Sequence, residues 1–146
     1  MDAKDNTNSH RSPGTVLIID DDPLTCRLLS KAFSKQGLKT LFCTNVTDAM
    51  HIIREELPDL IILDVHFPPG ADHIHRDGFW TLDWINQVIE VKDTPVIMIS
   101  GDTTVTTRHK ALAGGADAFL PKPLHLQEVM DISLNLITLS QIETGS

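Results

Sequence analysis

Short apolar runs alternate with amphipathic segments along most of this chain. The apolar runs lie at residues 15–19, 38–42, 60–63, 95–99 and 118–120. Each is short enough to be a buried strand of a parallel sheet. Between them, apolar residues recur at helical spacing. Helices are predicted at 23–36, after a cap at Asn45, at 79–91, at 105–113 and at 126–139.

The same spacing predicts which side of each helix faces the core. Gly37 and the pair Gly114–Gly115 are suited to end the helices that precede them. Trp80 and Trp84 lie four residues apart on the third helix and are expected to pack against the protein. The residues expected to point inward are Leu24, Leu28, Ala32, Phe33, Ala49, Ile52, Ile53, Leu57, Leu82, Ile85, Val88, Ile89, Leu126, Val129, Met130, Leu134 and Ile137.

Five strands alternating with five helices predict an α/β fold with a doubly wound parallel sheet. We expect a flavodoxin-like (βα)5 sandwich with strand order 2-1-3-4-5, whose switch point lies between the first and third strands. One domain at residues 15–140 is expected, between a polar tail at 1–14 and a short tail at 141–146. The few residues after the last helix leave no room for an output domain within this chain.

Polar residues follow four of the predicted strands. Asp20-Asp21-Asp22 follows the first, Asp64 the third, Ser100 the fourth and Lys122 the fifth. Parallel strands place their carboxyl ends at one edge of the sheet, where ligands bind. Carboxylates, a hydroxyl and an ammonium gathered there suit a divalent metal and a phosphoryl group.

The segments that carry these residues resemble the receiver domain of two-component response regulators. The resemblance rests on VLIIDDDP at 16–23, LIILDVHFP at 60–68, IMISG at 97–101 and GADAFLPKP at 115–123. It extends from about Thr15 to about Ser140. Any one of these motifs is weak, but all four in this order are specific.

The resemblance implies a role for each residue at the sheet edge. Asp64 would be the phosphoacceptor, because a carboxylate can attack phosphorus and form an acyl phosphate. Asp20 and Asp21, together with Asp64 and the backbone carbonyl of His66, would bind Mg²⁺, with Mn²⁺ as an alternative. Lys122 would be catalytic with Asp64, by stabilising charge on the phosphoryl oxygens.

Other residues near this edge have switch or structural assignments. Ser100 matches the hydroxyl of the family's switch, and Phe119 matches its aromatic partner. Asp22, directly before Pro23, is expected to cap a helix rather than bind metal. The bond before Pro123 is expected to be cis, as in the resembling family.

Composition argues against some partners and indicates a cellular location. The formal net charge of −8 argues against nucleic-acid binding, which is normally accompanied by a basic surface. Cys26 and Cys43 lack metal-ligand spacing and are expected to be buried, inert thiols. Without an apolar run long enough for a bilayer or a signal-peptide core, a cytoplasmic protein that does not contact membranes is expected.

The loop at 68–78 departs from the receiver pattern, because it is longer than usual by roughly six residues. It contains His73 and His75, which could suggest a metal site but in a polar loop more often face solvent. His51, His109 and His125 are interpreted as surface or helix-end residues. The loop is expected to overhang the site and to affect docking or phosphate lifetime.

The predicted function is a stand-alone phosphoacceptor that switches the surface of its fourth helix, fifth strand and fifth helix. Its partners would be a sensor histidine kinase or a histidine phosphotransfer protein, an unknown downstream protein and, as a further candidate, a second copy of itself. It would not turn over an external substrate. Alternatives are a relay intermediate, a fragment of a longer regulator, an aspartyl-phosphate hydrolase and a scaffold with a dead site. The hydrolase lacks support because position 66 holds His instead of a second acid.

Overall fold

The computed structural model describes residues 14–68 and 74–145, the side chains as far as residue 142. Within these residues, a parallel sheet of five strands has the order β2-β1-β3-β4-β5, which confirms the predicted fold class. The strands are β1 (Thr15–Ile19), β2 (Lys39–Cys43), β3 (Leu60–Asp64), β4 (Val96–Ser100) and β5 (Ala118–Pro121). The helices are α2 (Pro23–Lys35), α3 (Val46–Glu56), α4 (Gly78–Gln87), α5 (Val105–Ala113) and α6 (Leu126–Gly145).

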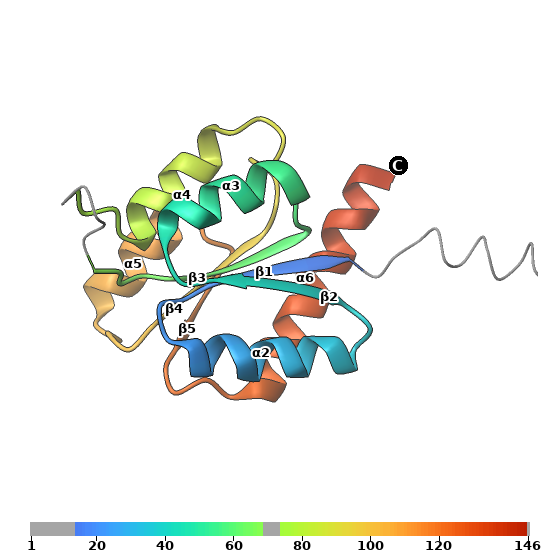
Figure 1. The fold of residues 1–146 in the computed structure, drawn as a ribbon, viewed down its shortest axis with the longest axis horizontal. Coiled ribbons are helices and arrows are strands. Elements are labelled where there is room, and N and C mark those ends of the chain that lie inside the picture. The colour runs from blue at the N-terminus through green and yellow to red at the C-terminus, as the bar shows by residue number, and fades with distance from the viewer. Residues whose placement is uncertain (1–13, 69–73, 146) are drawn as a thin grey trace, which may run out of the picture.

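Helices cover both faces of the sheet, as Figure 1 shows, and an apolar layer lies on each side of it. Alternate residues of β1 serve opposite layers, because side chains along a strand point to opposite faces. Leu17 and Ile19 pack in the cluster that includes residues of α3, α4 and α5. Val16 and Ile18 pack in the other cluster, with residues of α2 and α6. Burial on both faces explains why the central strands are almost continuously apolar.

Polar caps fix where the helices begin. The Asp22 side chain accepts a hydrogen bond from the Leu24 amide at the start of α2, and Asn45 accepts one from Asp48 at the start of α3. Both assignments from sequence are therefore confirmed. Gly37, directly after the C-cap residue Gln36 of α2, has φ of +82°, a conformation that glycine adopts without steric cost.

Helix α4 is shorter than predicted. It ends at Gln87, and Val88 already has extended backbone angles. The chain has to turn back towards β4, and Val91 is the residue that enters the core. Ile89 is 78% exposed, so its predicted inward position is wrong. Helix α6, in contrast, is longer than predicted and runs through 141–145.

The buried face of α2 also differs from the prediction. Cys26, Leu29 and Phe33 are fully buried, whereas Leu24 and Leu28 are 57% and 48% exposed. Both sets recur at helical spacing, so periodicity alone allowed either stripe to face the sheet. Contact with the sheet residues of the apolar cluster shared by α2 and α6 buries Cys26, Leu29 and Phe33.

Two further leucines predicted to point inward are exposed. Leu57 follows α3 with a left-handed φ of 46°, which carries its side chain out of the helical register. Leu126 opens α6 and lies beside Leu24 and Leu28 along one cleft. In the part of the chain that the structure describes, no helix is both long enough and apolar enough to cross a membrane.

Candidate functional site

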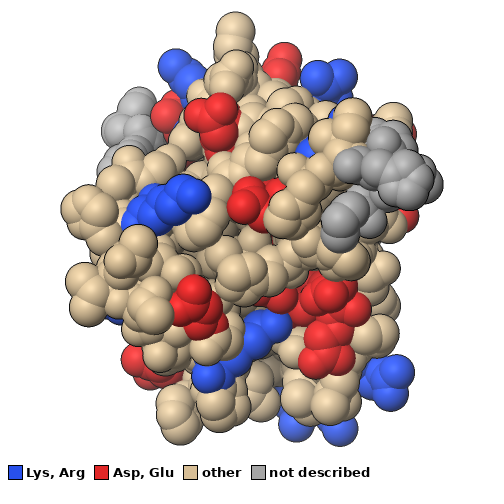
Figure 2. Space-filling view, turned by 90° about the vertical axis from the view of Figure 1, so that its left-hand side faces the viewer, with Lys and Arg blue, Asp and Glu red and all other residues tan. Residues whose placement is uncertain are grey.

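The carboxylates predicted to meet do meet, at the carboxyl edge of the sheet. Strands β1 and β3 are direct neighbours, with Ile19 opposite Leu63, so the residues that follow them converge. Ligand oxygens of Asp20, Asp21 and Asp64 all lie within 4.8 Å of one another. Figure 2 looks onto this side of the molecule, where acidic side chains surround a basic one.

The three carboxylates have very different environments. Asp20 is 0% exposed and Asp64 only 4%, while Asp21 is exposed to solvent. The Asp22 amide donates to Asp20 Oδ1 at 2.9 Å, and the His66 amide donates to Asp64 Oδ1 at 3.3 Å. Two buried acids so close together repel each other unless a cation lies between them.

Lys122 supplies positive charge to this cluster from the end of β5. Its Nζ lies 2.7 Å from Asp20 Oδ2 and donates to Asp64 Oδ2 at 3.0 Å. The contact with Asp20 is an ion pair without hydrogen-bond geometry, so Asp20 Oδ2 accepts no directed hydrogen bond although it is buried. The bond between Lys122 and Pro123 is cis, as predicted.

One ammonium does not neutralise three carboxylates. Burial raises the pKa of Asp64 and the charge of Asp20 raises it further, which outweighs the lowering by Lys122. Burial alone would lower the pKa of Lys122, but its close contacts with the carboxylates of Asp20 and Asp64 raise it overall. The site thus keeps Lys122 charged and leaves excess negative charge, which a divalent cation would relieve.

A close backbone contact places the start of α4 against Asp64. The Gly78 amide donates to the Val65 carbonyl at 2.7 Å. A Cβ added to Gly78 would lie 2.1 Å from the Asp64 carbonyl oxygen, far below any van der Waals distance. Only glycine fits there without displacing the backbone that carries Asp64.

The two predicted switch residues lie on the neighbouring strands. Ser100 ends β4 and is fully buried, and its Oγ accepts a hydrogen bond from the Asp102 amide at 2.9 Å. Phe119, on β5, is buried in the layer beneath α5. The guanidinium carbon of Arg108 lies 5.9 Å from the centre of its ring. The fold therefore links both residues to α5.

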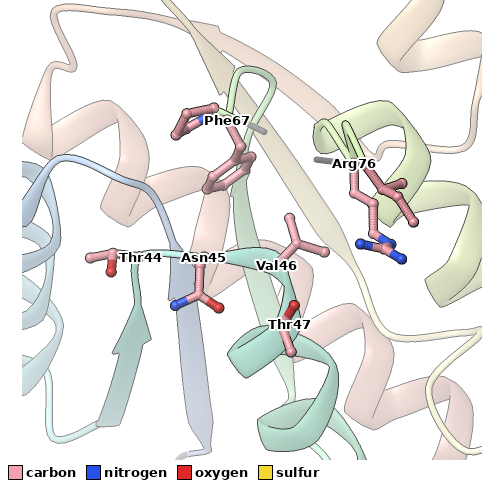
Figure 3. Close-up of a pocket in the computed structure, with 8 residues that line it drawn as sticks. Thr44, Asn45, Val46, Thr47, Phe67 and Arg76 are labelled. Atoms are coloured by element: carbon pink, nitrogen blue, oxygen red, sulfur yellow. The ribbon is translucent and has the colours of Figure 1, made fainter. Parts of the chain in front are cut away.

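The long loop contributes a small pocket beside the site. Phe67, Pro68, Ile74 and Arg76 line it together with residues 44–47 at the start of α3, as Figure 3 shows. His75 is exposed and its Nε2 lies 2.9 Å from the Phe67 carbonyl oxygen. His73 lies outside the described residues. Within them, neither His75 nor His66 belongs to a metal-ligating cluster.

Of the remaining assignments from sequence, those of the cysteines, of His51, His109 and His125 and of Trp84 are confirmed, and that of Trp80 is not. Burial raises the pKa of Cys26 to about 11 and that of Cys43 to about 12, so both thiols are protonated at neutral pH. His51, His109 and His125 are exposed. Trp84 packs against the core, and Trp80 is 39% exposed.

Sequence reasoning missed Asp102 and Thr107. Asp102 lies two residues after Ser100, and its carboxylate accepts hydrogen bonds from the Thr104 amide and the Thr107 hydroxyl. An Asp followed by threonines before a helix is a recognisable capping signal. The contact of the Asp102 amide with Ser100 has no sequence signature.

Comparisons with known proteins agree with this geometry. The sequence profile of the response regulator receiver domain matches residues 16–133. The polar-differentiation response regulator DivK of Brucella anthropi is 24% identical, over 82% of this chain and 92% of its own. The uncharacterized transcriptional regulatory protein YvcP of Bacillus subtilis is 30% identical over 79% of this chain, which spans 45% of YvcP.

Solved structures share the fold. The CheY-like receiver-domain protein from Methanospirillum hungatei superimposes with a TM-score of 0.77 at 19% identity, covering 88% of this chain and 97% of its own. The chain belongs to the response regulator receiver domains of two-component signal transduction. It spans less than half of YvcP and 26% of the regulatory protein AtoC of Escherichia coli.

Proposed function

We propose that this receiver domain accepts a phosphoryl group on Asp64 from a phosphohistidine of a sensor kinase or phosphotransfer protein. A carboxylate oxygen of Asp64 attacks phosphorus, the P–N bond of the phosphohistidine breaks, and its electron pair returns to the imidazole nitrogen. The observation that carries this proposal is the contact of Lys122 with both Asp20 and Asp64 at the end of the sheet.

The surrounding residues would support the transfer by charge and position. Lys122 Nζ, 3.0 Å from Asp64 Oδ2, would stabilise the charge of the phosphoryl oxygens, and the Ser100 hydroxyl would donate to one of them in the product. Hydrolysis by water would later return Asp64 to its free carboxylate. Receiver domains switch between states rather than turn over a substrate, and we propose the same for this chain.

The carboxylate cluster fits a hard divalent cation such as Mg²⁺, with Mn²⁺ as an alternative. Asp20, Asp21 and Asp64 offer oxygens within 4.8 Å of one another, and buried Asp20 Oδ2 lacks a directed donor. Together with the backbone carbonyl of His66, they would hold the ion, which would neutralise charge on the cluster and on the incoming phosphoryl group. The imidazole of His66 would not take part.

A cleft beside Lys122 is suited to the donor protein. It has a volume of about 560 Å³ and is lined by Leu24, Leu28, Leu124 and Leu126, with Asp22 and Lys122 at its polar end. Exposed apolar side chains grouped next to a reactive centre favour a protein partner. The output would involve the surface of α5, β5 and α6, in contact with a downstream protein or a second copy of the chain. A cytoplasmic setting is part of this proposal.

A labelling experiment tests the phosphoacceptor. The protein is incubated with a small phosphodonor with and without Mg²⁺, and covalent phosphate is located by mass spectrometry. We expect labelling at Asp64 only with Mg²⁺ and none in Asp64→Asn. Acid-stable, base-labile phosphate that persists in Asp64→Asn would place the nucleophile elsewhere.

A second assay separates the receiver from an aspartyl-phosphate hydrolase. Position 66 holds an exposed His where such a hydrolase would carry its second acid. We therefore expect no multiple turnover of p-nitrophenyl phosphate. Steady turnover that is lost in Asp64→Asn would support the hydrolase instead.

A further inference from the structure

Ser100 is held in place by a residue without an assigned role. Its buried Oγ accepts a hydrogen bond from the backbone amide of Asp102 at 2.9 Å. A serine hydroxyl can accept and donate at once, so this contact occupies one lone pair and leaves the O–H able to turn. Any rotation of Ser100 towards Asp64 would lengthen the contact with Asp102.

The carboxylate of Asp102 holds the first turn of α5. Its Oδ1 accepts from the Thr104 amide at 3.0 Å, and its Oδ2 accepts from the buried Thr107 hydroxyl at 2.8 Å. The Thr107 amide in turn donates to the Thr104 hydroxyl at 3.3 Å. These hydrogen bonds, that of the Thr104 amide first, lower the pKa of Asp102 and keep it ionised at neutral pH.

The backbone between Ser100 and Asp102 borders open space. Gly101 separates Ser100 from Asp102, and a Cβ added there would meet no atom within 4 Å. Beyond the cap, α5 carries Arg108, whose guanidinium lies over the ring of Phe119. A displacement that starts at Ser100 can therefore reach α5 through Asp102, and α5 contacts Phe119 through Arg108.

We propose that Asp102 is a positioning residue that transmits the state of Ser100 to α5. When the Ser100 side chain rotates to donate to a phosphoryl oxygen on Asp64, its Oγ moves away from the Asp102 amide, which loses its acceptor. The same residue binds the amide of Thr104, the N-cap of α5, and the hydroxyl of Thr107 in its first turn, so the cap and that turn shift with it. This inference rests on the proposed phosphorylation of Asp64, and it adds the connection by which that event reaches the helix.

The first test needs no phosphate. Amide hydrogen exchange is measured on the free protein and on Ser100→Ala, which removes the acceptor. Exchange of the Asp102 amide and the first turn of α5 should become about fivefold faster, as for the loss of a helix cap. Asn45→Ala, which removes the cap of α3 but does not touch Ser100, should leave that region unchanged. Unchanged exchange in Ser100→Ala would overturn the proposal.

The second test compares wild type, Asp102→Ala and Asp102→Asn, each with Mg²⁺ and a fluoroberyllate analogue of the phosphoryl group. Wild type should show about fivefold faster exchange in the first turn of α5 when the analogue binds. Asp102→Ala should exchange fast in both states and lose the difference. Asp102→Asn, whose side-chain oxygen can still accept from the amide of the cap residue Thr104, should restore it.

Labelling of Asp64 in each variant keeps the two proposals distinguishable. If wild type is labelled and Asp102→Ala keeps the full analogue-dependent change, the coupling by Asp102 is wrong but the phosphoacceptor stands. If wild type is not labelled, the proposed function fails, and the coupling fails with it. Should Asp102→Ala not fold, Thr107→Val removes only one contact of the carboxylate and is expected to reduce the change. A full change in that variant would also overturn the coupling.

Discussion

The two edges of the sheet use aspartates in opposite ways. At the amino edge, Asp59 and Asp117 each make a reciprocal pair with the first residue of a neighbouring strand. Asp59 Oδ2 accepts from the Thr15 amide at 2.8 Å, and Asp117 Oδ2 accepts from the Val96 amide at 2.9 Å. The Asp59 and Asp117 amides donate back to the carbonyls of Thr15 and Val96, each at 2.8 Å.

At the carboxyl edge, the aspartates face one another instead of the backbone. Asp20 and Asp64 are buried together, and Lys122 is the basic residue that forms ion pairs with them among the described residues. The amino-edge carboxylates satisfy backbone donors and stabilise the fold. The carboxyl-edge carboxylates carry unbalanced negative charge, which lowers stability and which a bound divalent cation would relieve.

The largest effect should come from the backbone of the carboxyl edge, not from its charges. Gly78→Ala forces a Cβ to within 2.1 Å of the Asp64 carbonyl oxygen, so the start of α4 has to move. We expect a loss of about 3 kcal/mol or more in unfolding free energy, measured by urea denaturation.

Gly101→Ala is the matched control, because its Cβ meets nothing within 4 Å. Its unfolding free energy should stay within about 0.5 kcal/mol of wild type. Equal stabilities of the two variants would mean that the edge is not as rigid as the contact at Gly78 implies.

Binding of Mg²⁺ should offset the loss of stability that the unbalanced carboxylates cause at the carboxyl edge. Binding to the folded state alone stabilises by about 2.7 kcal/mol at a concentration one hundred times the Kd. Thermal unfolding with increasing Mg²⁺ should therefore show a rising Tm in wild type and in Asp59→Asn. Asp21→Asn, which removes an exposed ligand, should shift the rise to higher concentration. A Tm that rises equally in all three proteins would point to a cation effect outside the cluster.

Removing an amino-edge carboxylate should destabilise the protein. Asp117→Ala leaves the Val96 amide without its acceptor at 2.9 Å, at a cost of about 1 to 2 kcal/mol. Urea denaturation without divalent ions measures it. If Asp117→Ala were as stable as wild type, the amino-edge carboxylates would not stabilise the fold, and the two edges would not differ in this way.

Neutralising a carboxyl-edge aspartate should stabilise the protein, and this is the smallest of the expected effects. Asp64→Asn removes a buried charge next to Asp20, and we expect it to stabilise the metal-free protein by about 1 kcal/mol. Urea denaturation in a chelator, from neutral pH downward, measures the gain. Destabilisation at neutral pH would show that the ion pair with Lys122 outweighs the burial of Asp64.

The pH dependence of this gain follows from the sign of the pKa shift. The pKa of Asp64 is raised on folding, so its protonated form favours the folded state. The stability that the protonated Asp64 carboxyl contributes is therefore fully present below its ordinary, unfolded-state pKa. It is lost as pH rises through its higher folded-state pKa. The advantage of Asp64→Asn should be largest at neutral pH and shrink as pH falls below the folded pKa of Asp64.

Much of the candidate site was predictable because it depends on strand ends. Asp20, Asp64, Ser100 and Lys122 each follow an apolar run, and parallel strands bring such residues together whatever their distances along the chain. The face of α2 was not predictable in this way. Its two apolar stripes fit helical spacing equally well, and contact with the sheet selected Cys26, Leu29 and Phe33 over Leu24 and Leu28.

By itself, the sequence determined the order of strands and helices, the capping residues Asp22 and Asn45, and which residues converge at the carboxyl edge. These features depend on local patterns and on one topological rule. Only the tertiary structure decided that Asp20 is buried against Lys122 with an oxygen that accepts no directed hydrogen bond, that α4 stops at Gln87, and that Asp102 holds Ser100 and α5 together. Each of these depends on contacts between segments that meet only after the sheet has formed, and such contacts leave no periodic signal in the chain.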